Sequence, residues 1–407
     1  MKFKADKLIP EVNIGVLGHV DHGKTTLVDA ITGKWTDTHS EEIERGITIR
    51  LGYADATFYK CTNCGTFSTS NKCIKCFSPT TPIRTVSFVD APGHESLMAT
   101  VLTASALMDG ALLVISATEK CPMPQTREHL MTLEVVGIKN IVIVQNKIDL
   151  VSKERVLESY KEIKEFIKGT VAENAPIVPV SAQQKINIEY LIEAIEEFIP
   201  TPKRDENKLT KMFVARSFDI NKPGSDIEKL VGGILGGSIA EGVLKVGDEI
   251  VLVPGLRLDG KYIQVSTKVV SLEKGGKRLQ EAGPGGLVGV MTELDPYLTK
   301  ADGLAGNLLC YRENIPPERN NLIIDVKLLE RVVGTKELET MEEIKLNEIL
   351  MINIGPCRSV GIVTGVKGRR ITLSLKMPVY AEATERVVLS RQIAGRWRLI
   401  GYGNIVE

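Results

Sequence analysis

The sequence predicts a multidomain protein that combines one α/β domain with two all-β domains. Three observations predict this class. Apolar runs alternate with amphipathic stretches through the first half of the chain, later runs are short and separated by glycine, and two Pro- and charge-rich breaks divide the chain. We therefore expect an α/β domain at 1–203, a β-barrel at 204–320 and a second β-barrel at 321–407.

The first half predicts a mostly parallel sheet with helices on both faces. Strands of nearly continuous apolar sequence alternate with segments of helical periodicity, as βαβ units require. The expected strands are VNIGVLG (12–18), TVSFVD (85–90), ALLVISA (111–117), NIVIVQN (140–146) and PIVPVSA (176–182), and the clearest expected helices span 153–169 and 187–199. The segment IPTPKRDENKL (199–209) that follows is interpreted as an interdomain linker.

The second half predicts two β-barrels. Its β-type runs are short, and glycines supply the turns and bulges that a small closed barrel needs. Runs of this kind occupy 211–220, 232–255, 266–276 and 285–295, and then, after the break YRENIPPERNN (311–321), 322–334, 348–356, 359–379, 385–392 and 396–406. No repeat of fixed period is visible.

The formal net charge is zero because two uneven parts of the chain cancel. Residues 1–203 contain 22 basic and 25 acidic residues, whereas the segment from Pro356 to the end contains 9 basic and 3 acidic residues. A net charge of zero argues against a nucleic-acid partner, but the basic final segment weakens that argument.

The sequence also predicts a cytoplasmic protein with no membrane partner. It contains no run of 18 apolar residues, which a membrane-spanning helix would need. Its start, MKFKADKLIPEVNIGV, lacks an apolar segment followed by a small-residue cleavage site. We therefore expect an unprocessed amino terminus.

A phosphate-binding loop is predicted between the first strand and the helix TTLVDAIT. The residues Gly18-His-Val-Asp-His-Gly23-Lys24-Thr25 match G-x-x-x-x-G-K-[ST]. The glycines let backbone N–H groups point at phosphate oxygens, Lys24 neutralises the β- and γ-phosphates, and the Thr25 hydroxyl is a ligand for Mg²⁺. A chance match in a glycine-rich turn is the alternative, and the strand and helix that flank the motif argue against it.

Guanine is the base that the sequence predicts. Asn146-Lys147-Ile148-Asp149 ends the strand NIVIVQN, and the Asp149 carboxylate can accept hydrogen bonds from guanine N1–H and N2–H₂. Adenine presents an acceptor at N1 and would leave the carboxylate unpaired. The segment Ser181, Ala182 and Gln183 can complete the pocket with a backbone donor to the guanine O6 atom.

Two further segments predict switch loops that respond to the γ-phosphate. In Asp90-Ala-Pro-Gly93-His94, Asp90 would hold Mg²⁺ through a water and the Gly93 amide would bond the γ-phosphate. His94 is the candidate for orienting the attacking water, and a structural role is its alternative. In Glu-Arg-Gly-Ile-Thr48, Thr48 can coordinate the same Mg²⁺ in the triphosphate state.

A zinc site is predicted near 58–80 from Cys61-x₂-Cys64-x₈-Cys73-x₂-Cys76. Two CxxC turns supply four thiolates, which suit tetrahedral Zn²⁺ in a reducing compartment where disulfides are disfavoured. A redox pair would need only one CxxC, and an iron–sulfur cluster shows different spacing. We expect a structural zinc knuckle, and we expect Cys121, Cys310 and Cys357 to be buried or free thiols.

Together these motifs resemble the translational GTPases of the elongation factor Tu type, over essentially the whole chain. Within that family the chain looks like the archaeal gamma subunits of translation initiation factor two. The segments that carry this closer resemblance are WTDTHSEEIERGITIRLGYA, the four-cysteine insertion before DAPGHESLMAT, PMPQTREHL, GTVAENAPIVPVSA, RSFDINKPG, LDPYLTKAD and SRQIAGRWRLIGYG.

The resemblance implies roles for individual residues. Guanine contacts fall on Asn146, Lys147, Asp149 and the segment 181–183. Phosphate and ribose-side contacts fall on Asp21, His22, Gly23, Lys24, Thr25 and Thr26. One Mg²⁺ falls to Thr25 and Thr48, and a second metal contact falls to Asp21 and the Gly46 carbonyl. Val20 and Ile47 resemble an apolar gate between His94 and the attacking water. The brief x₈ interval leaves the orientation of the knuckle open.

The resemblance also implies partners and a rate. It implies a heterotrimer with alpha and beta subunits that carries initiator methionyl-tRNA to the small ribosomal subunit when GTP is bound. Slow intrinsic hydrolysis is expected, because no arginine of the phosphate-binding loop or of the two switch segments is placed to stabilise the transition-state charge as an arginine finger does. Arg391, Arg396 and Arg398 are candidates for tRNA contacts, and a solvated barrel face is the alternative, because scattered cations on barrels usually face solvent.

Two other functions remain open. A selenocysteine-specific elongation factor would carry a fourth carboxy-terminal domain, for which we expect no room in a chain that ends at Glu407. A GTP-dependent scaffold, in which hydrolysis is incidental, would show the same motifs without a catalytic role for His94.

Overall fold

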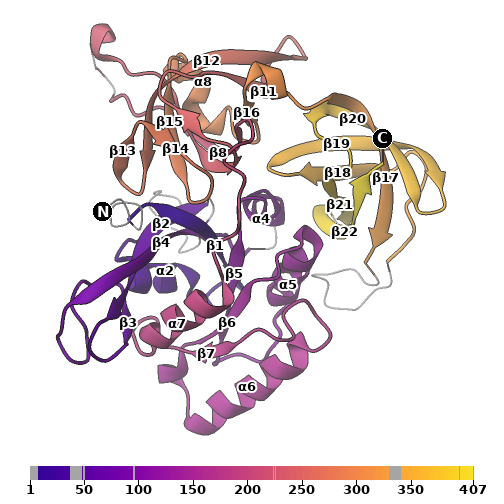
Figure 1. Ribbon diagram of the computed structural model, residues 1–407. Helices are drawn as coiled ribbons and strands as arrows, with labels where there is room; N and C mark the ends of the chain where they lie inside the picture. The colour runs from indigo at the N-terminus through magenta and orange to yellow at the C-terminus, as the bar shows by residue number, and fades with distance from the viewer. Residues whose placement is uncertain are drawn as a thin grey trace. The chain divides into compact units, whose positions relative to one another are not determined.

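The computed structural model describes residues 8–36, 48, 51–94, 97–222, 224, 226–329, 341–393 and 395–406. These residues form two compact units with a boundary between Pro202 and Lys203 (Figure 1). Within the described residues, no helix is both long enough and apolar enough to cross a membrane.

Unit 1 is built on a seven-stranded sheet in the order β3-β2-β4-β1-β5-β6-β7. The strands are β1 (Pro10–Gly18), β2 (Gly52–Cys61), β3 (Phe67–Ser68), β4 (Thr80–Asp90), β5 (Gly110–Ser116), β6 (Ile141–Asn146) and β7 (Ile177–Pro179). The five strands from β4 to β7 in this order pair in parallel, and each predicted strand overlaps one of them. The sequence did not predict β2 and β3, which extend the sheet in antiparallel pairings.

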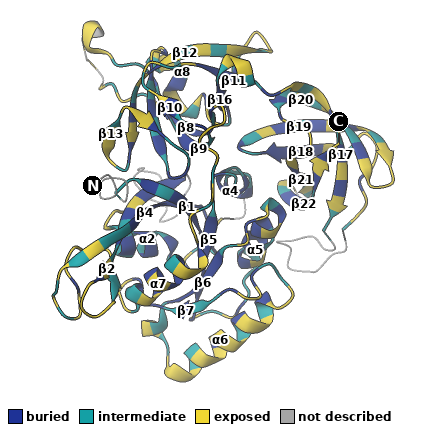
Figure 2. Ribbon diagram, in the orientation of Figure 1, coloured by how far each residue is buried: buried dark blue, intermediate teal, exposed yellow. Residues whose placement is uncertain are grey.

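Helices cover both faces of this sheet, as predicted. On one face, α2 (Lys24–Thr32) and α7 (Ile188–Phe198) share a core cluster with the strands. The other helices of unit 1 are α4 (Met98–Ser105), α5 (Pro124–Val136) and α6 (Lys153–Ile167). The short helix η2 (Ile148–Leu150) follows β6. Every residue of β5 is buried, as expected of a strand with helices on both sides (Figure 2).

The first barrel of unit 2 closes through six strands. Its circuit is β11 (Glu249–Leu258), β16 (Leu308–Cys310), β8 (Lys211–Phe218), β9 (Ile234–Glu241), β15 (Val288–Thr292) and β12 (Lys261–Lys274), closed by the pairing of β11 with β12. The register of that pairing shifts between Leu252 and Leu256. Gly255 stands there at φ 91°, where a Cβ atom would overlap the carbonyl oxygen of Ile263. Glycine therefore makes the bulge, as the sequence predicts.

The first barrel region also contains several short strands and helices. They are β10 (Leu244–Lys245) paired with β14 (Glu281–Ala282), β13 (Lys277–Leu279), α8 (Pro296–Thr299), η3 (Ile227–Lys229), η4 (Lys300–Asp302) and η5 (Arg312–Asn314).

The second barrel is a closed circuit of β17 (Glu318–Leu328), β20 (Arg370–Tyr380), β19 (Cys357–Lys367), β18 (Ile349–Ile354), β21 (Arg386–Ile393) and β22 (Arg396–Ile405). Alternate residues of β18, namely Leu350, Ile352 and Ile354, point into its core. The prediction of an α/β domain followed by two β-barrels is thus confirmed.

Candidate functional site

A cavity of about 470 Å³ lies in unit 1 beyond the carboxyl ends of β1, β4 and β6. Ligands of open α/β sheets bind at this edge, because the loops that follow neighbouring parallel strands converge there. The cavity brings together residues of all five predicted nucleotide-site segments. Its lining residues are Val20, Asp21, Gly23, Lys24, Thr25, Thr26, Trp35, Thr48, Gly93, His94, Asn146, Lys147, Asp149, Leu150, Ala182 and Gln183.

The loop between β1 and α2 adopts a conformation that favours glycine. Gly23 has φ 85°, and Asp21, at φ 60°, is a non-glycine residue in the left-handed region. A Cβ atom on Gly23 would stand 2.5 Å from Asn146 Nδ2, so the loop approaches the end of β6 closely. Lys24 Nζ donates to the His19 carbonyl oxygen at 2.9 Å, which holds its ammonium at the mouth of the loop.

Two buried histidines form hydrogen-bonding contacts at this loop on the side of the protein interior. His129 of α5 accepts a hydrogen bond at Nδ1 from the Gly18 amide at 2.7 Å, and burial lowers its pKa to about 3. The ring is therefore neutral and can accept at Nδ1, while Nε2 has no hydrogen-bond partner among the described residues. Burial also lowers the pKa of His22 to about 4, and its ring contacts the Val114 carbonyl oxygen at 3.0 Å.

The His22 side chain therefore faces the protein interior and does not line the cavity. Ser181 is placed similarly, since it is fully buried and its Oγ atom accepts from the Gln184 amide at 3.2 Å. For both residues, only the backbone is left for the predicted nucleotide contacts. The sequence had no signal for the supporting role of His129.

Asn146 joins the two loops that flank the cavity. Its Nδ2 atom donates to the His22 carbonyl oxygen at 2.9 Å, and its Oδ1 atom accepts from the Ala182 amide at 3.0 Å. Both polar atoms of this 2% exposed side chain are thus used within the protein. Asn146 is a positioning residue that fixes the phosphate loop against the loop after β7.

The predicted base-recognition residues lie together at one end of the cavity. Lys147 adopts φ 62°, which turns the chain from β6 into η2 and places Asp149 on the lining. Asp149 is exposed, and its carboxylate forms no ion pair or hydrogen bond within the described ranges of the chain. Ala182 and Gln183 line the same cavity. This carboxylate is therefore available to two donors on a ligand.

Oxygen atoms suited to Mg²⁺ cluster at the other end. Thr25 Oγ1 lies 3.1 Å from Thr48 Oγ1 and donates to Asp90 Oδ2 at 2.8 Å. Thr36, which the sequence analysis did not single out, also donates to Asp90 Oδ2, at 2.7 Å. Two hydroxyls and a carboxylate form the hard-oxygen set that Mg²⁺ prefers, so these residues fit the ion. Gly46 and Ile47 lie outside the described residues.

Gly93 lies against the phosphate loop. A Cβ atom at this position would stand 2.5 Å from Lys24 Nζ, 2.9 Å from the Val20 amide nitrogen and 3.0 Å from the Gly18 carbonyl oxygen. Only glycine permits this approach, because two of the three atoms belong to the backbone. The next residue, His94, is exposed and lines the cavity.

Two lining residues, Trp35 and Leu150, were missed in the sequence analysis. Their side chains are 50% and 66% exposed, respectively, although both are apolar. Their positions beside predicted site segments could have identified them, since Trp35 follows the helix after the phosphate loop and Leu150 follows Asp149 directly. Exposed apolar side chains at a polar cavity are suited to covering the faces of a planar ligand.

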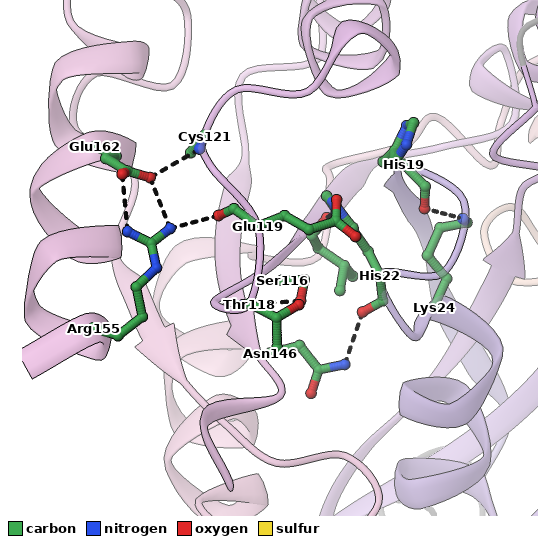
Figure 3. A network of polar contacts seen from close by, with 11 residues as sticks. His19, His22, Lys24, Ser116, Thr118, Glu119, Cys121, Asn146, Arg155 and Glu162 are labelled. Carbon is green, nitrogen blue, oxygen red and sulfur yellow. Dashed lines mark hydrogen bonds and ion pairs between the residues drawn. The ribbon is translucent and has the colours of Figure 1, made fainter. Parts of the chain in front are cut away.

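A polar network ties helix α6 to the loop beneath the phosphate site (Figure 3). Arg155 donates to the carbonyl oxygens of Ala117 and Glu119 at 3.1 and 2.7 Å and pairs with both carboxylate oxygens of Glu162. Glu162 also accepts from the Cys121 amide at 2.9 Å. The Glu119 carboxylate in turn lies 3.3 Å from His22 Nε2. Arg155 therefore holds the loop that contacts the phosphate loop.

We expect Arg155→Ala to lower the free energy of unfolding by about 2–3 kcal/mol, because Glu162 and two carbonyl groups lose a charged donor. Equilibrium urea unfolding measures the change. Lys164→Ala, an exposed position on the same helix, should change stability by less than about 0.5 kcal/mol. Equal stability of the two variants would contradict a structural role for the network.

The same network predicts a pH dependence. Its hydrogen bonds to Arg155 lower the pKa of Glu162 below the usual 4.5. A lowered carboxyl pKa stabilises the fold above 4.5, and this contribution disappears as the pH falls through the folded-state value. The stability difference between the wild type and Glu162→Gln should therefore be full at pH 7 and shrink below pH 4.5.

The four predicted zinc ligands converge at the end of β2. All four sulfur atoms lie within 4.8 Å of one another, and the pairs Cys61–Cys76, Cys64–Cys73 and Cys64–Cys76 are separated by 3.5 Å. Thiolates at a Zn–S distance of about 2.3 Å in a tetrahedron stand about 3.8 Å apart. The cluster therefore fits a Zn²⁺ ion.

Two turns of the same geometry build this cluster. In the first, the Gly65 amide donates to the Cys61 carbonyl oxygen, and in the second the Phe77 amide donates to that of Cys73, both at 3.1 Å. Gly65 and Phe77 have φ values of 73° and 57°. Phe77 thus adopts a conformation that a side chain disfavours, which shows that the second turn is constrained by its surroundings.

The orientation of the knuckle, left open by the sequence, is fixed by contacts with α7. Lys75 Nζ lies 3.6 Å from a Glu189 carboxylate oxygen and 5.0 Å from the centre of the Tyr190 ring. Phe67 of β3 packs against the core of unit 1. Of the remaining cysteines, Cys121 and Cys310 are buried and Cys357 is partly buried.

The three arginines that the sequence offers for tRNA contacts differ in exposure and in their bonds. Arg391 pairs with both carboxylate oxygens of Glu348 and donates to the Glu342 carbonyl oxygen at 3.0 Å. Arg398 is 6% exposed, and Arg396 is exposed. Arg391 therefore has a structural role in the second barrel.

Family models match three consecutive parts of the chain. Residues 10–201 match the elongation factor Tu GTP binding domain, 232–307 match elongation factor Tu domain 2, and 320–405 match the carboxy-terminal domain of initiation factor eIF2 gamma. Because GTP hydrolysis is general to the first of these families, the match supports this activity for unit 1.

Solved structures share the fold. A bacterial selenocysteine-specific elongation factor superposes with a TM-score of 0.75 at 25% identity, covering 98% of this chain, which spans 58% of that chain. The elongation factor SelB of Methanococcus maripaludis with the GTP analogue GppNHp gives a TM-score of 0.73 at 23% identity, with 98% and 79% covered.

Curated relatives are much more similar in sequence. The translation initiation factor 2 subunit gamma of Pyrococcus furiosus is 59% identical over 98% of both chains. Those of Methanothermobacter thermautotrophicus and Methanocaldococcus jannaschii are 57% and 55% identical, over 97% of this chain and 98% and 97% of theirs. The chain therefore belongs to the family of archaeal translation initiation factor 2 gamma subunits.

Proposed function

We propose that this protein is the GTP-binding subunit of an initiation factor that delivers initiator methionyl-tRNA to the small ribosomal subunit and is switched off by GTP hydrolysis. It would act in the cytoplasm as a heterotrimer with alpha and beta subunits. The names of relatives that are 53–59% identical over nearly the full chain support this assignment.

The observation that carries the nucleotide assignment is the cavity of unit 1. It places the available Asp149 carboxylate at one end and the Lys24 ammonium with the Thr25–Thr48–Asp90 oxygens at the other. A guanine base requires the first group of atoms, and a magnesium-bound triphosphate requires the second. No other base would satisfy the Asp149 carboxylate through two donors in this way.

Each predicted residue then has a defined task. Backbone N–H groups of residues 21–26 would surround the phosphates. Asn146 holds this loop against the loop of Ala182 and Gln183. Thr25 and Thr48 would ligate Mg²⁺ directly, Asp90 would act through a water, and Asp21 with the Gly46 carbonyl would supply the second metal contact. The bound ion would neutralise developing charge on the phosphates.

Hydrolysis would depend on the segment Gly93–His94. The Gly93 amide would bond the γ-phosphate, and His94 would orient a water for attack on phosphorus, giving GDP and inorganic phosphate. No arginine lines the cavity within the described residues, so the intrinsic rate should be low. Stimulation would then come from the ribosome or from an accessory protein.

Zinc would have a structural role at Cys61, Cys64, Cys73 and Cys76, since four thiolates leave no open position on the ion. We expect one Zn²⁺ per chain by native mass spectrometry and loss of that mass in Cys73→Ser. Removal of zinc should expose the knuckle to proteolysis, because metal binding supplies much of the folding free energy of such small sites. Cys357→Ser, outside the cluster, should keep the metal, and equal zinc loss in both variants would contradict the assignment.

Three domains would divide these tasks. We place the GTPase domain at 1–203 and the barrels at 204–320 and 321–407, in agreement with the order of the family matches. The barrels would provide surfaces for tRNA and for the sister subunits.

Filter binding of tRNA tests the proposed function. The purified heterotrimer should retain initiator methionyl-tRNA in the presence of a GTP analogue and release it with GDP. Elongator aminoacyl-tRNAs should bind much more weakly under the same salt conditions. Equal binding of elongator tRNAs would overturn the assignment and favour another tRNA-delivering GTPase, such as the selenocysteine-specific factor.

A further inference from the structure

A second cavity, of about 380 Å³, lies entirely within unit 2, where the β11–β12 hairpin of the first barrel meets strands of the second barrel. Its walls combine cations with aromatic and thioether side chains. The lining residues are Arg257, Tyr262, Met351, Arg358, Ser359, Val360, Lys376, Met377 and Trp397. Among these described lining residues there is no carboxylate.

Three cations converge on this cavity without partners. Arg257, Arg358 and Lys376 are exposed, and none has a carboxylate oxygen within 4.0 Å in the part of the chain that the structure describes. Other cations of unit 2 do form ion pairs, such as Lys211 with Glu385 at 2.7 Å. Three converging positive charges without a counter-charge produce a positive potential that favours an anionic ligand.

The remaining walls suit a flat aromatic group. Trp397 and Tyr262 are each partly buried, and Met351 and Met377 add polarisable apolar surface. The chain has only two tryptophans, of which Trp35 lines the first cavity and Trp397 lines this one. Indole and phenol rings beside cations are the combination that stacks a nucleobase and holds its phosphate.

Packing between the barrels fixes the walls in place. Val251, Val253, Leu308 and Cys310 form a buried cluster with Phe213, Ile315 and Tyr380. Gln264 Nε2 donates to Tyr380 Oη at 3.2 Å, which links β12 to β20. Arg257 is paired with Tyr262 across the hairpin. Because its walls are held by these contacts, the cavity is formed before any ligand binds.

We propose that this cavity binds a nucleotide, with the base on Trp397 and Tyr262 and the phosphate between Arg358, Lys376 and Arg257. Its volume admits one nucleotide and no duplex, so the ligand is a free nucleotide or one unstacked nucleotide of single-stranded RNA. An acidic peptide would satisfy the cations but would leave both aromatic faces uncovered. This site is inferred from residues of unit 2 alone and does not rest on the nucleotide site of unit 1.

Fluorescence anisotropy of labelled hexa-adenylate tests the proposal. The full chain is first saturated with GDP, so that the probe cannot report on the first cavity. Lys376→Glu and Arg358→Glu should each weaken binding at least tenfold and reduce its salt dependence. Trp397→Ala should weaken binding about tenfold, whereas Trp397→Phe, which keeps a stacking face, should stay within about threefold of the wild type.

Lys367→Glu is the matched control, because this exposed residue belongs to the same barrel but does not line the cavity. It should retain binding to within about threefold. Competition by AMP at the concentration of unlabelled hexa-adenylate would assign the site to free nucleotides, and much weaker competition would assign it to RNA; both results support a nucleotide site. Displacement by hexaglutamate as efficient as by RNA, or wild-type affinity in Lys376→Glu and Trp397→Ala, would overturn it.

Discussion

Asp149→Asn should weaken GTP binding by about 100-fold or more and create a preference for xanthosine triphosphate. The carboxylate accepts from two guanine donors, N1–H and N2–H₂, whereas an asparagine amide offers one acceptor and one donor. Xanthine carries a carbonyl oxygen in place of the 2-amino group, so it matches the amide. The exposed Asp149 carboxylate makes no bond within the described chain, so the substitution should leave the fold unchanged.

Equilibrium binding of fluorescent GDP and XDP to both proteins measures this reversal. Asp259→Asn, an exposed turn position of unit 2, is the matched control and should bind both nucleotides as the wild type does. Weaker binding of GDP and XDP alike in Asp149→Asn would indicate a damaged loop. Unchanged GDP affinity would remove Asp149 from base recognition.

The sequence predicted the α/β unit well because its signals are local. Buried parallel strands such as β5 are continuously apolar, and α6 shows helical periodicity together with a Ser152 side chain that caps its first turn. It missed β2, whose residues alternate between buried and partly exposed positions and pair with β4 in antiparallel fashion. That pairing depends on register between segments, which no local pattern encodes.

The sequence predicted which residue types form the site, but it did not predict which bonds each of them makes within the protein. The sequence predicts that Asn146 contacts the base, but it does not predict the bonds of its two polar atoms to the protein backbone at His22 and Ala182. His129 was visible only as one of five histidines, and its bond to the Gly18 amide joins residues that lie 111 positions apart. Such long-range contacts arise from packing, so a motif cannot reveal them.

His94→Ala should lower the single-turnover rate of GTP cleavage about 100-fold or more while leaving GTP affinity nearly unchanged. His94 lines the cavity next to Gly93, which lies against the phosphate loop, so its side chain can reach the γ-phosphate end without holding the ground-state nucleotide. His94→Gln, which can still orient a water by hydrogen bonding, should retain more activity than the alanine variant.

Gly93→Ala provides the contrasting defect. Its Cβ atom would press on the Val20 amide and the Gly18 carbonyl group, at 2.9 and 3.0 Å, so it should weaken binding of a GTP analogue more than binding of GDP. Rapid mixing with labelled GTP, measured with and without ribosomal subunits, separates the two effects.

If His94→Ala cleaves GTP at the wild-type rate under both conditions, His94 has no part in catalysis and the protein would act as a GTP-dependent scaffold. A rate defect that appears only with ribosomal subunits would place the role of His94 in the stimulated reaction, because the intrinsic rate is already low.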